Sequence, residues 1–461
     1  GPPIGPFGST DRSRGASRSA GADLPSVTVP PTMFALVLAL LAACATGPAS
    51  SDSAVATATH LARQPAVVTG AQRLVDERFR ALDGMRVGLV TNHTARVDTA
   101  DGGPAHLIDR MHAAPNVIVG ALFGPEHGIR GDAEAGAGVS GGLDATTGAP
   151  VYSLYGRRKK PTPRQMRGLD ALVFDMQDVG ARFYTYISTM GYAMQAAAEA
   201  GVPFVVLDRP NPIGDRVEGF VLEPRQRSFV GLYEIPITHG LTVGELAQMI
   251  VGEGLLDGLP DLDLRIVEME GYDRGMLWEA TGLPWIPPSP NVPDVETARV
   301  YPGTAFFEGT PASEGRGTRV PFTHVGAPWV DGEALAAELN GLGLAGVRFE
   351  PTSFTPIDLP GQATNPKWEG DEVNGVRLEV TDPDAFEPVA AGVWIVDGVY
   401  RQAPRGAHSA YFNADWLAKL AGTTALRRHL VDGEGPEAAI AAWRAEADAF
   451  RQRAEPYRIY S

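Results

Sequence analysis

The chain has 461 residues, of which 44% are hydrophobic and 20% are charged, so it is long enough to bury a core and to form two domains. Its 39 Lys and Arg residues are outnumbered by 55 Asp and Glu residues, which gives a formal net charge of −16. Because the balance is acidic and no long basic stretch is present, we expect no nucleic-acid partner.

An apolar run over residues 33–43 ends at Cys44, the single cysteine of the sequence. The run is too short to span a bilayer but suits the core of a signal peptide. The string LAAC at 41–44 resembles a bacterial lipobox, in which the cysteine becomes the lipidated first residue. The resemblance predicts lipidation of Cys44 and export to the periplasmic or extracellular face of the cell envelope, with membrane contact only through the lipid anchor. The alternative is a leaderless protein in which the run is a core helix.

Composition divides the chain into five expected segments. Residues 45–59 are rich in Ala, Ser, Thr and Gly, which cannot bury enough surface to order themselves. The segments are an over-called start or leader at 1–32, a lipoprotein signal peptide at 33–44, a flexible tether at 45–70, a catalytic domain at 71–298 and a C-terminal domain at 299–461.

Compact apolar runs alternate with helical patterns along the first large segment. The runs at 85–90, 116–123, 171–176 and 203–208 are typical of buried parallel strands, and residues 186–200 have the periodicity of a helix. We therefore predict an α/β fold with a mostly parallel, Rossmann-like sheet. Residues 375–381 favour a later strand, and the pattern from Trp416 onward favours packed terminal helices.

Polar loops follow the four predicted strands, at 91–94, 124–131, 177–184 and 209–212. Ligands of open α/β sheets bind at the carboxyl ends of strands, so these loops predict one site. The first loop has no glycine to admit a pyrophosphate, and we expect no cofactor. His93, His127 and His239 lack the spacing of zinc ligands, and we expect no metal.

Carboxylates in these loops and in the later string SEGRGT at 313–318 suit hydrolysis of a glycosidic bond, which needs an acid and a second group that activates water or attacks carbon. Glu126 is the best candidate acid, because it directly follows a predicted strand between Pro125 and His127. The alternative is a structural pair of Glu126 with Arg130. Glu314 and Asp178 are both candidates for the second role, with structural salt bridges as the alternative.

Other polar side chains are candidates for substrate binding. Arg130 and Arg182 suit a carboxylate clamp, with structural ion pairs as the alternative. Tyr184 and Trp285 suit stacking on a sugar, with core packing as the alternative. The remaining candidates are Asn92, His93, His127, Asn211, Asn291 and Arg316.

Long strings in these loops together resemble the exo-β-N-acetylmuramidase family. They are VTNHTARVD from Val90, FGPEHGIRGDAEAG from Phe123, FDMQDVGARFYTYISTM from Phe174, LDRPNPIGDRVEG from Leu207 and WIPPSPNVPDVETARVYPGTAFFEGTPASEGRGT from Trp285. Asp215 and Val292 depart mildly from the family pattern.

The resemblance implies a Rossmann-like catalytic domain followed by a smaller α/β domain, with the active site in the cleft between them. It also implies release of terminal N-acetylmuramic acid from peptidoglycan-derived glycans or muropeptides, with Glu126 of the GPEHG string as the catalytic glutamate. The rival hypothesis is a non-catalytic surface lipoprotein that binds muropeptides or glycans. An esterase or amidase is less favoured, because Ser188, Ser289 and Ser313 have no nucleophile-elbow setting.

Overall fold

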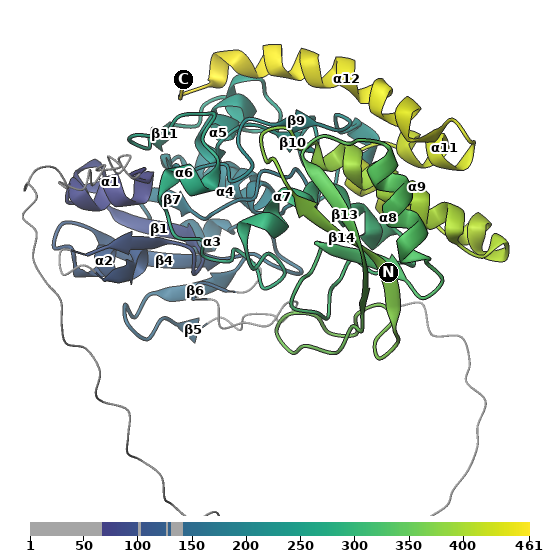
Figure 1. Ribbon diagram of the computed structural model, residues 1–461. Coiled ribbons are helices and arrows are strands. Elements are labelled where there is room, and N and C mark those ends of the chain that lie inside the picture. The colour runs from purple at the N-terminus through teal and green to yellow at the C-terminus, as the bar shows by residue number, and fades with distance from the viewer. Residues whose placement is uncertain (1–66, 100–102, 126–127, 131–141) are drawn as a thin grey trace, which may run out of the picture. The chain divides into compact units, whose positions relative to one another are not determined.

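The computed structural model describes residues 67–99, 103–125, 128–130 and 142–461, all within one compact unit (Figure 1). The predicted leader and signal peptide, including Cys44, lie outside this range, and so does the predicted tether at 45–70 except for its last four residues. Those four residues are ordered, because Val67 is buried and Gly70 begins helix α1 (Gly70–Asp76). Within the described residues, no helix is both long and apolar enough to cross a membrane.

A seven-stranded sheet forms the first part of the fold, with the strand order β11-β8-β7-β1-β4-β6-β5. Neighbouring strands are parallel except β5 and β6 at one edge. In chain order the strands are β1 (Arg86–Thr91), β4 (Ile118–Gly124), β5 (Gly142–Leu143), β6 (Pro150–Ser153), β7 (Ala171–Asp175), β8 (Phe204–Leu207) and β11 (Leu264–Val267). The predicted α/β class is confirmed, and the four predicted strands correspond to β1, β4, β7 and β8.

Helices cover both faces of this sheet because its central strands are apolar on both sides. Val87 and Leu89 of β1 pack in a cluster with α1 (Gly70–Asp76) and α2 (Leu107–Ala113). Val90 faces the opposite cluster, which includes α4 (Tyr186–Ala200) and α5 (Val243–Gly252). Helix α4 has the predicted bounds and ends at Gly201, whose φ of 67° is the left-handed conformation that glycine adopts without strain.

A smaller part with its own sheet follows, as expected. Its three strands are antiparallel in the order β12-β14-β13. The strands are β12 (His324–Ala327), β13 (Val347–Phe354) and β14 (Val373–Val380), and the last of these overlaps the predicted strand over residues 375–380. The helices are α8 (Gly332–Gly341), α9 (Pro388–Gln402), α10 (Ala414–Ala421), α11 (Ala425–Val431) and α12 (Gly435–Ala454).

Short elements connect the larger ones. The two-stranded pairs are β2 (Arg96–Asp98) with β3 (Pro104–His106), and β9 (Val217–Glu218) with β10 (Thr238–His239). The remaining α-helices are α3 (Pro163–Met166), α6 (Trp278–Thr281) and α7 (Val295–Thr304). The 3₁₀ helices are η1 (Arg80–Leu82), η2 (Pro224–Gln226), η3 (Ala305–Gly309), η4 (Arg405–Ala410) and η5 (Glu455–Tyr457).

One hydrophobic cluster continues from the large sheet into the smaller part. It includes Phe174 of β7, Ala298 of α7 and Val393 of α9. Helices α7 and α9 approach at Gly303 and Gly392, where an added Cβ on Gly303 would lie 1.9 Å from a carbonyl oxygen of α9. Helix α12 contacts both α9 and β9, and Figure 1 shows it running along the top of the view. The smaller part therefore shares its core with the sheet domain.

Candidate active site

The loops after β1, β7 and β8 are joined by hydrogen bonds at the carboxyl edge of the sheet. Asn92 Oδ1 accepts hydrogen bonds from the backbone N–H of Thr94 at 3.0 Å and from its hydroxyl at 2.6 Å. The same hydroxyl accepts from the backbone N–H of Gln177, whose side chain donates to Pro210 O at 2.8 Å. The prediction that these loops meet at one edge is confirmed for these three.

Several polar atoms at this edge are buried and have no hydrogen-bond partner within the described part of the chain. They are Asn92 Nδ2, Gln177 Oε1 and Asp178 Oδ1. An unsatisfied buried polar atom costs about 1–3 kcal/mol unless water or a ligand reaches it. Other atoms of this kind are scattered over the described residues, whereas these three lie together. Their grouping after neighbouring strands marks this edge as the candidate site.

Asp178 is buried, and its carboxyl group has a raised pKa. Its Oδ2 accepts a hydrogen bond from the backbone N–H of Gly180 at 2.7 Å, and 5% of the residue is exposed. Burial raises the pKa of Asp178 to about 7, although backbone N–H groups of Gly180 and Val179 oppose the shift. A carboxyl with such a pKa exchanges a proton near neutrality, as a general acid must.

Glu314 has the opposite character, because two cations contact it. Lys367 Nζ lies 2.8 Å from Oε2 and Arg316 Nε lies 3.5 Å from Oε1. Burial by itself would raise the pKa of Glu314, but Lys367 and Arg316 hold that pKa below its ordinary value. Glu314 therefore stays ionised near neutral pH.

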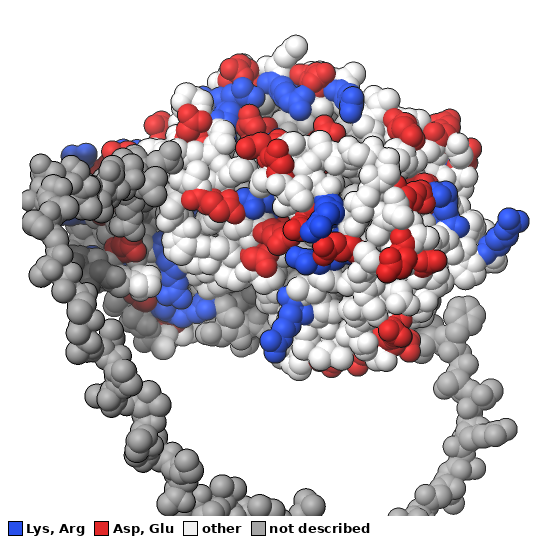
Figure 2. Space-filling view, in the orientation of Figure 1, with Lys and Arg blue, Asp and Glu red and all other residues white. Residues whose placement is uncertain are grey.

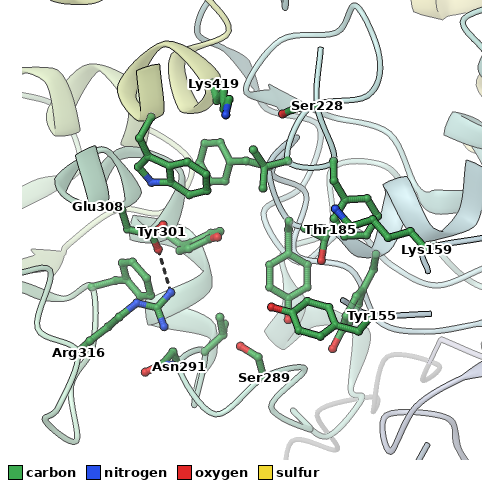
Figure 3. A pocket seen from close by; sticks show the side chains of 18 of the residues that line it. Tyr155, Lys159, Thr185, Ser228, Ser289, Asn291, Tyr301, Glu308, Arg316 and Lys419 are labelled. Atoms are coloured by element: carbon green, nitrogen blue, oxygen red, sulfur yellow. Dashed lines mark hydrogen bonds and ion pairs between the residues drawn. The ribbon is translucent and has the colours of Figure 1, made fainter. Parts of the chain in front are cut away.

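A cavity of about 580 Å³ lies between residues of the sheet domain and residues of the smaller part. Its walls come from the loop after β6, the residues that lead into α4, the segment before α7, and α10 (Figure 3). Aromatic side chains make up much of the lining, among them Tyr155, Tyr184, Phe229, Tyr301 and Trp416.

Three predicted substrate-binding residues line this cavity: Tyr184, Asn291 and Arg316. Asn291 donates to Gln362 O at 2.7 Å, and its Oδ1 has no partner among the described residues. Arg316 donates to Glu308 at 2.8 Å, as the dashed line in Figure 3 marks. Asn92, His93, Asp178 and Glu314 are not among the lining residues. His93 lies nearby in the fold, with Nε2 2.7 Å from Pro287 O in the segment before α7.

Arg182 makes structural contacts and is not among the residues that line the cavity. Its guanidinium is fully buried and donates to the carbonyl oxygens of Phe220, Ile235 and Leu420 at 2.7–2.8 Å. These three contacts favour a structural role, and the carboxylate clamp stays a prediction for Arg182.

Arg130 and Asn211 also make structural contacts. Arg130 pairs with Asp109 at 2.8 Å and Asp144 at 2.9 Å, which matches the alternative of a structural ion pair. Asn211 donates to Leu241 O and accepts from the backbone N–H of Ile213. Trp285, suggested for sugar stacking, packs edge-on against Trp278 and is not in the cavity lining.

Glu126 and His127 lie outside the described residues. Their predicted roles therefore stay predictions. The strand before them, β4, ends at Gly124 beside β1, so the loop that carries them starts at the carboxyl edge described above.

Several residues that line the cavity were not predicted from the sequence, notably Lys159, Phe229, Glu308, Trp416 and Lys419. Lys159 belongs to the basic string RRKK at 157–160, which is conspicuous in an acidic chain and could have indicated a site for an anionic ligand. Trp416 and Lys419 lie in an amphipathic helix, where nothing in the sequence separates a cavity wall from ordinary packing.

Comparison with known proteins decides the family. The model described as "Exo-beta-N-acetylmuramidase NamZ, N-terminal" matches residues 87–296, and the corresponding C-terminal model matches residues 299–460. The chain belongs to the exo-beta-N-acetylmuramidase NamZ family. The resemblance found in the sequence is thereby confirmed, and the boundary between the two matches falls in α7.

Relatives of this family cover almost the whole described chain. The peptidoglycan beta-N-acetylmuramidase NamZ of Bacillus subtilis (strain 168) is 43% identical over 432 residues, which is 93% of this chain and 99% of that protein. Two crystal structures of DUF1343 family proteins from Bacteroides fragilis have the same fold. BF0371 superposes with a TM-score of 0.78 at 37% identity, and BF0379 with 0.70 at 32%. Each covers 86% of this chain and 99% of its own.

Proposed function

We propose that this protein is an exo-acting glycoside hydrolase that releases terminal β-linked N-acetylmuramic acid from peptidoglycan fragments. The observation that carries the proposal is its 43% identity, over nearly the full length of both chains, to a protein named peptidoglycan beta-N-acetylmuramidase. The two family matches, over residues 87–296 and 299–460, include the loops that follow β1, β7 and β8.

The cavity supports the proposal. Its volume of about 580 Å³ lies within the range of ~300–1,000 Å³ that is usual for small-ligand sites. Aromatic faces with a few polar groups suit a sugar ring and its substituents. A compact pocket of this size favours removal of one terminal unit over binding along a long glycan.

Glu126 is the proposed general acid. A glycosidase needs a second carboxyl group with a different protonation state, and two carboxyl groups meet that need in different ways. Asp178, with a pKa near 7, is suited to exchanging protons with the leaving group or water. Glu314, held ionised by Lys367 and Arg316, is suited to a role that requires a permanent negative charge.

The test is release of nitrophenol from para-nitrophenyl β-glycosides of N-acetylmuramic acid and N-acetylglucosamine by the purified protein. We expect release from the muramic substrate alone. Glu126→Gln should lower kcat by about 100-fold or more, because general acid catalysis contributes on the order of 10²–10⁴. Asp178→Asn and Glu314→Gln are measured in the same assay. The variant that lowers kcat while keeping the wild-type melting temperature identifies the second catalytic group.

Full activity of Glu126→Gln would remove that residue from the mechanism. Absence of release from either substrate, with tight binding of muramic acid, would favour the rival hypothesis of a non-catalytic lipoprotein that binds muropeptides or glycans.

We further propose that the chain is exported and anchored to the cell envelope by a lipid on Cys44, because LAAC at 41–44 ends an apolar run. In a bacterial host, the full chain should fractionate with membranes and incorporate labelled palmitate. Cys44→Ser should abolish the label. A wild-type protein that carries no label would contradict the proposal.

A further inference from the structure

The cavity has a charge balance opposite to that of the whole protein. The chain has a formal net charge of −16, yet the charged lining residues are Lys159, Arg316, Lys419 and a single carboxylate, Glu308. Figure 2 shows acidic and basic side chains mixed on one face of the molecule, without a large area of either sign. The lining residues of the cavity therefore differ in charge balance both from the whole chain and from the face shown in Figure 2.

Arg316 does not account for this excess, because carboxylates already contact it. Glu308 lies 2.8 Å from its guanidinium and Glu314 lies 3.5 Å away. Within the described residues, neither Lys159 nor Lys419 forms an ion pair with a carboxylate, and their recorded contacts are with aromatic rings. These two lysines are the cations that the cavity offers to a ligand.

Each lysine lies over an aromatic ring of the cavity wall. Lys159 Nζ is 3.9 Å from the centre of the Phe229 ring, which stacks in turn on Tyr192 with an interplanar angle of 4°. Lys419 Nζ is 5.9 Å from the centre of the Trp416 ring, one turn earlier in α10. A cation over a ring face is attracted to it without losing its charge, so both ammonium groups are held in place and still able to bind an anion.

The two lysines come from different parts of the fold. Lys159 lies in the loop between β6 and α3, and Lys419 lies in α10 of the smaller part. Figure 3 shows them on different walls of the cavity. Arg157 and Arg158 beside Lys159 are exposed, and Lys160 pairs with Glu199 at 2.5 Å. The loop thus adds positive potential at the wall, which attracts anionic substrates.

We propose that Lys159 and Lys419 form a carboxylate-recognition subsite that selects sugars with an acidic side arm over neutral sugars. This inference rests on the proposed function and names residues that give it its substrate specificity. The carboxylate is either the free lactyl group of muramic acid or a carboxylate of an attached stem peptide. Both present the same anion to the ammonium groups.

The first experiment compares kcat/KM for three para-nitrophenyl glycosides: muramic acid with a free lactyl group, its lactyl methyl ester, and muramic acid carrying L-Ala-D-Glu. We expect the wild type to prefer the free acid over the ester by about tenfold or more, as for a charge-assisted contact. Lys159→Met and Lys419→Met keep the apolar stem and should each bring the acid-to-ester ratio towards one, mainly through KM. Lys159→Arg and Lys419→Arg should restore the ratio.

Lys160→Met is the matched control, because Lys160 belongs to the same loop but does not line the cavity. It should keep the wild-type acid-to-ester ratio. If the lysine-to-methionine variants change kcat/KM for the dipeptide substrate only and keep the wild-type acid-to-ester ratio, the subsite binds a carboxylate of the stem peptide. If both lysine-to-methionine variants keep the wild-type ratios at unchanged melting temperature, the inference is wrong although the proposed function stands.

Calorimetric binding of free N-acetylmuramic acid and N-acetylglucosamine tests the subsite without turnover. The acid should bind about tenfold more tightly, and the double lysine-to-methionine variant should bind both sugars alike. Equal affinity of the wild type for the two sugars would exclude the lactyl group as the bound anion. Combined with lysine variants that keep the wild-type preference for the dipeptide substrate, it would overturn the inference. Lysine-dependent preference for the acid in a protein that cleaves no glycoside would support the subsite and contradict the proposed function.

Discussion

At the scale of single residues, neighbouring side chains in one loop have different roles. Tyr184 lines the cavity, whereas Arg182, two residues earlier, is buried and donates hydrogen bonds to three backbone carbonyl oxygens. Burial lowers the pKa of the Arg182 guanidinium to about 9, so the side chain remains charged near neutral pH. Its carbonyl partners come from Phe220, Ile235 and Leu420, so Arg182 connects distant segments of the chain.

We predict that Arg182→Met destabilises the fold by about 3 kcal/mol or more, because buried carbonyl groups that lose a donor cost ~1–3 kcal/mol each. Denaturant unfolding should show the loss, and KM of the folded protein should stay near that of the wild type. The exposed Arg405→Met is the control and should be neutral. A clamp on the substrate would give the reverse pattern, with raised KM and unaltered stability.

The sequence predicted residue types at the site better than it predicted their directions. Tyr184, Asn291 and Arg316 line the cavity, but Arg182, Arg130 and Asn211 turn to structural partners. Charge and loop position are visible in a sequence. The direction in which an arginine points depends on carbonyl groups that are distant along the chain, such as Leu420 O for Arg182.

At the scale of elements, the strands with complete burial were predicted, whereas strands with mixed burial were predicted only in part: β14 was found, and β11 and β13 were not. Strands β1, β7 and β8 are buried along nearly their whole length and appear in the sequence as unbroken apolar runs. Strand β11 is half-exposed, and β13 alternates irregularly between buried and exposed residues. Strand β13 also contains Pro351, which an edge strand of a sheet tolerates and which obscures the pattern in the sequence.

At the scale of the whole molecule, the cavity is built from segments that are far apart in the sequence. Lys159 and Trp416 line the same cavity, although they lie in different family matches. The strand loops could be grouped from the sequence because parallel strands end at one edge of a sheet. The packing of α10 onto the sheet domain follows no such rule. The contribution of α10 to the cavity wall, Trp416 and Lys419, could therefore not be predicted from the sequence.

The two parts are also joined by a buried carboxyl group. Glu218 of β9 accepts hydrogen bonds from the backbone N–H groups of Val389 at 2.8 Å and Ala390 at 3.4 Å, in the first turn of α9. Burial raises the pKa of Glu218 to about 8, with Arg216 opposing the shift and Glu387 adding to it. Its other oxygen has no partner among the described residues.

This raised pKa predicts how stability varies with pH. A carboxyl whose pKa is about 8 when folded and near 4.5 when unfolded binds more protons in the folded state between these values. Its contribution is fully present below the unfolded pKa and is lost as pH rises through the folded pKa. We expect the melting temperature to fall by a few degrees between about pH 6 and pH 8.5. Asp178 and Asp208, with pKa values raised to about 7 and about 6, act in the same direction.

Glu218→Gln isolates the contribution of Glu218 to the pH dependence of the melting temperature. Glutamine mimics the neutral acid, and its amide oxygen can still accept hydrogen bonds from the backbone N–H groups of α9. Calorimetry should give a melting temperature close to the wild type at pH 6 and higher than the wild type at pH 8.5. The exposed Glu333→Gln should follow the wild type at both values. A pH dependence that is equal in Glu218→Gln and the wild type would show that Glu218 is ionised in the fold. Ion pairing and the N–H groups of α9, and not burial, would then dominate the junction between the two parts.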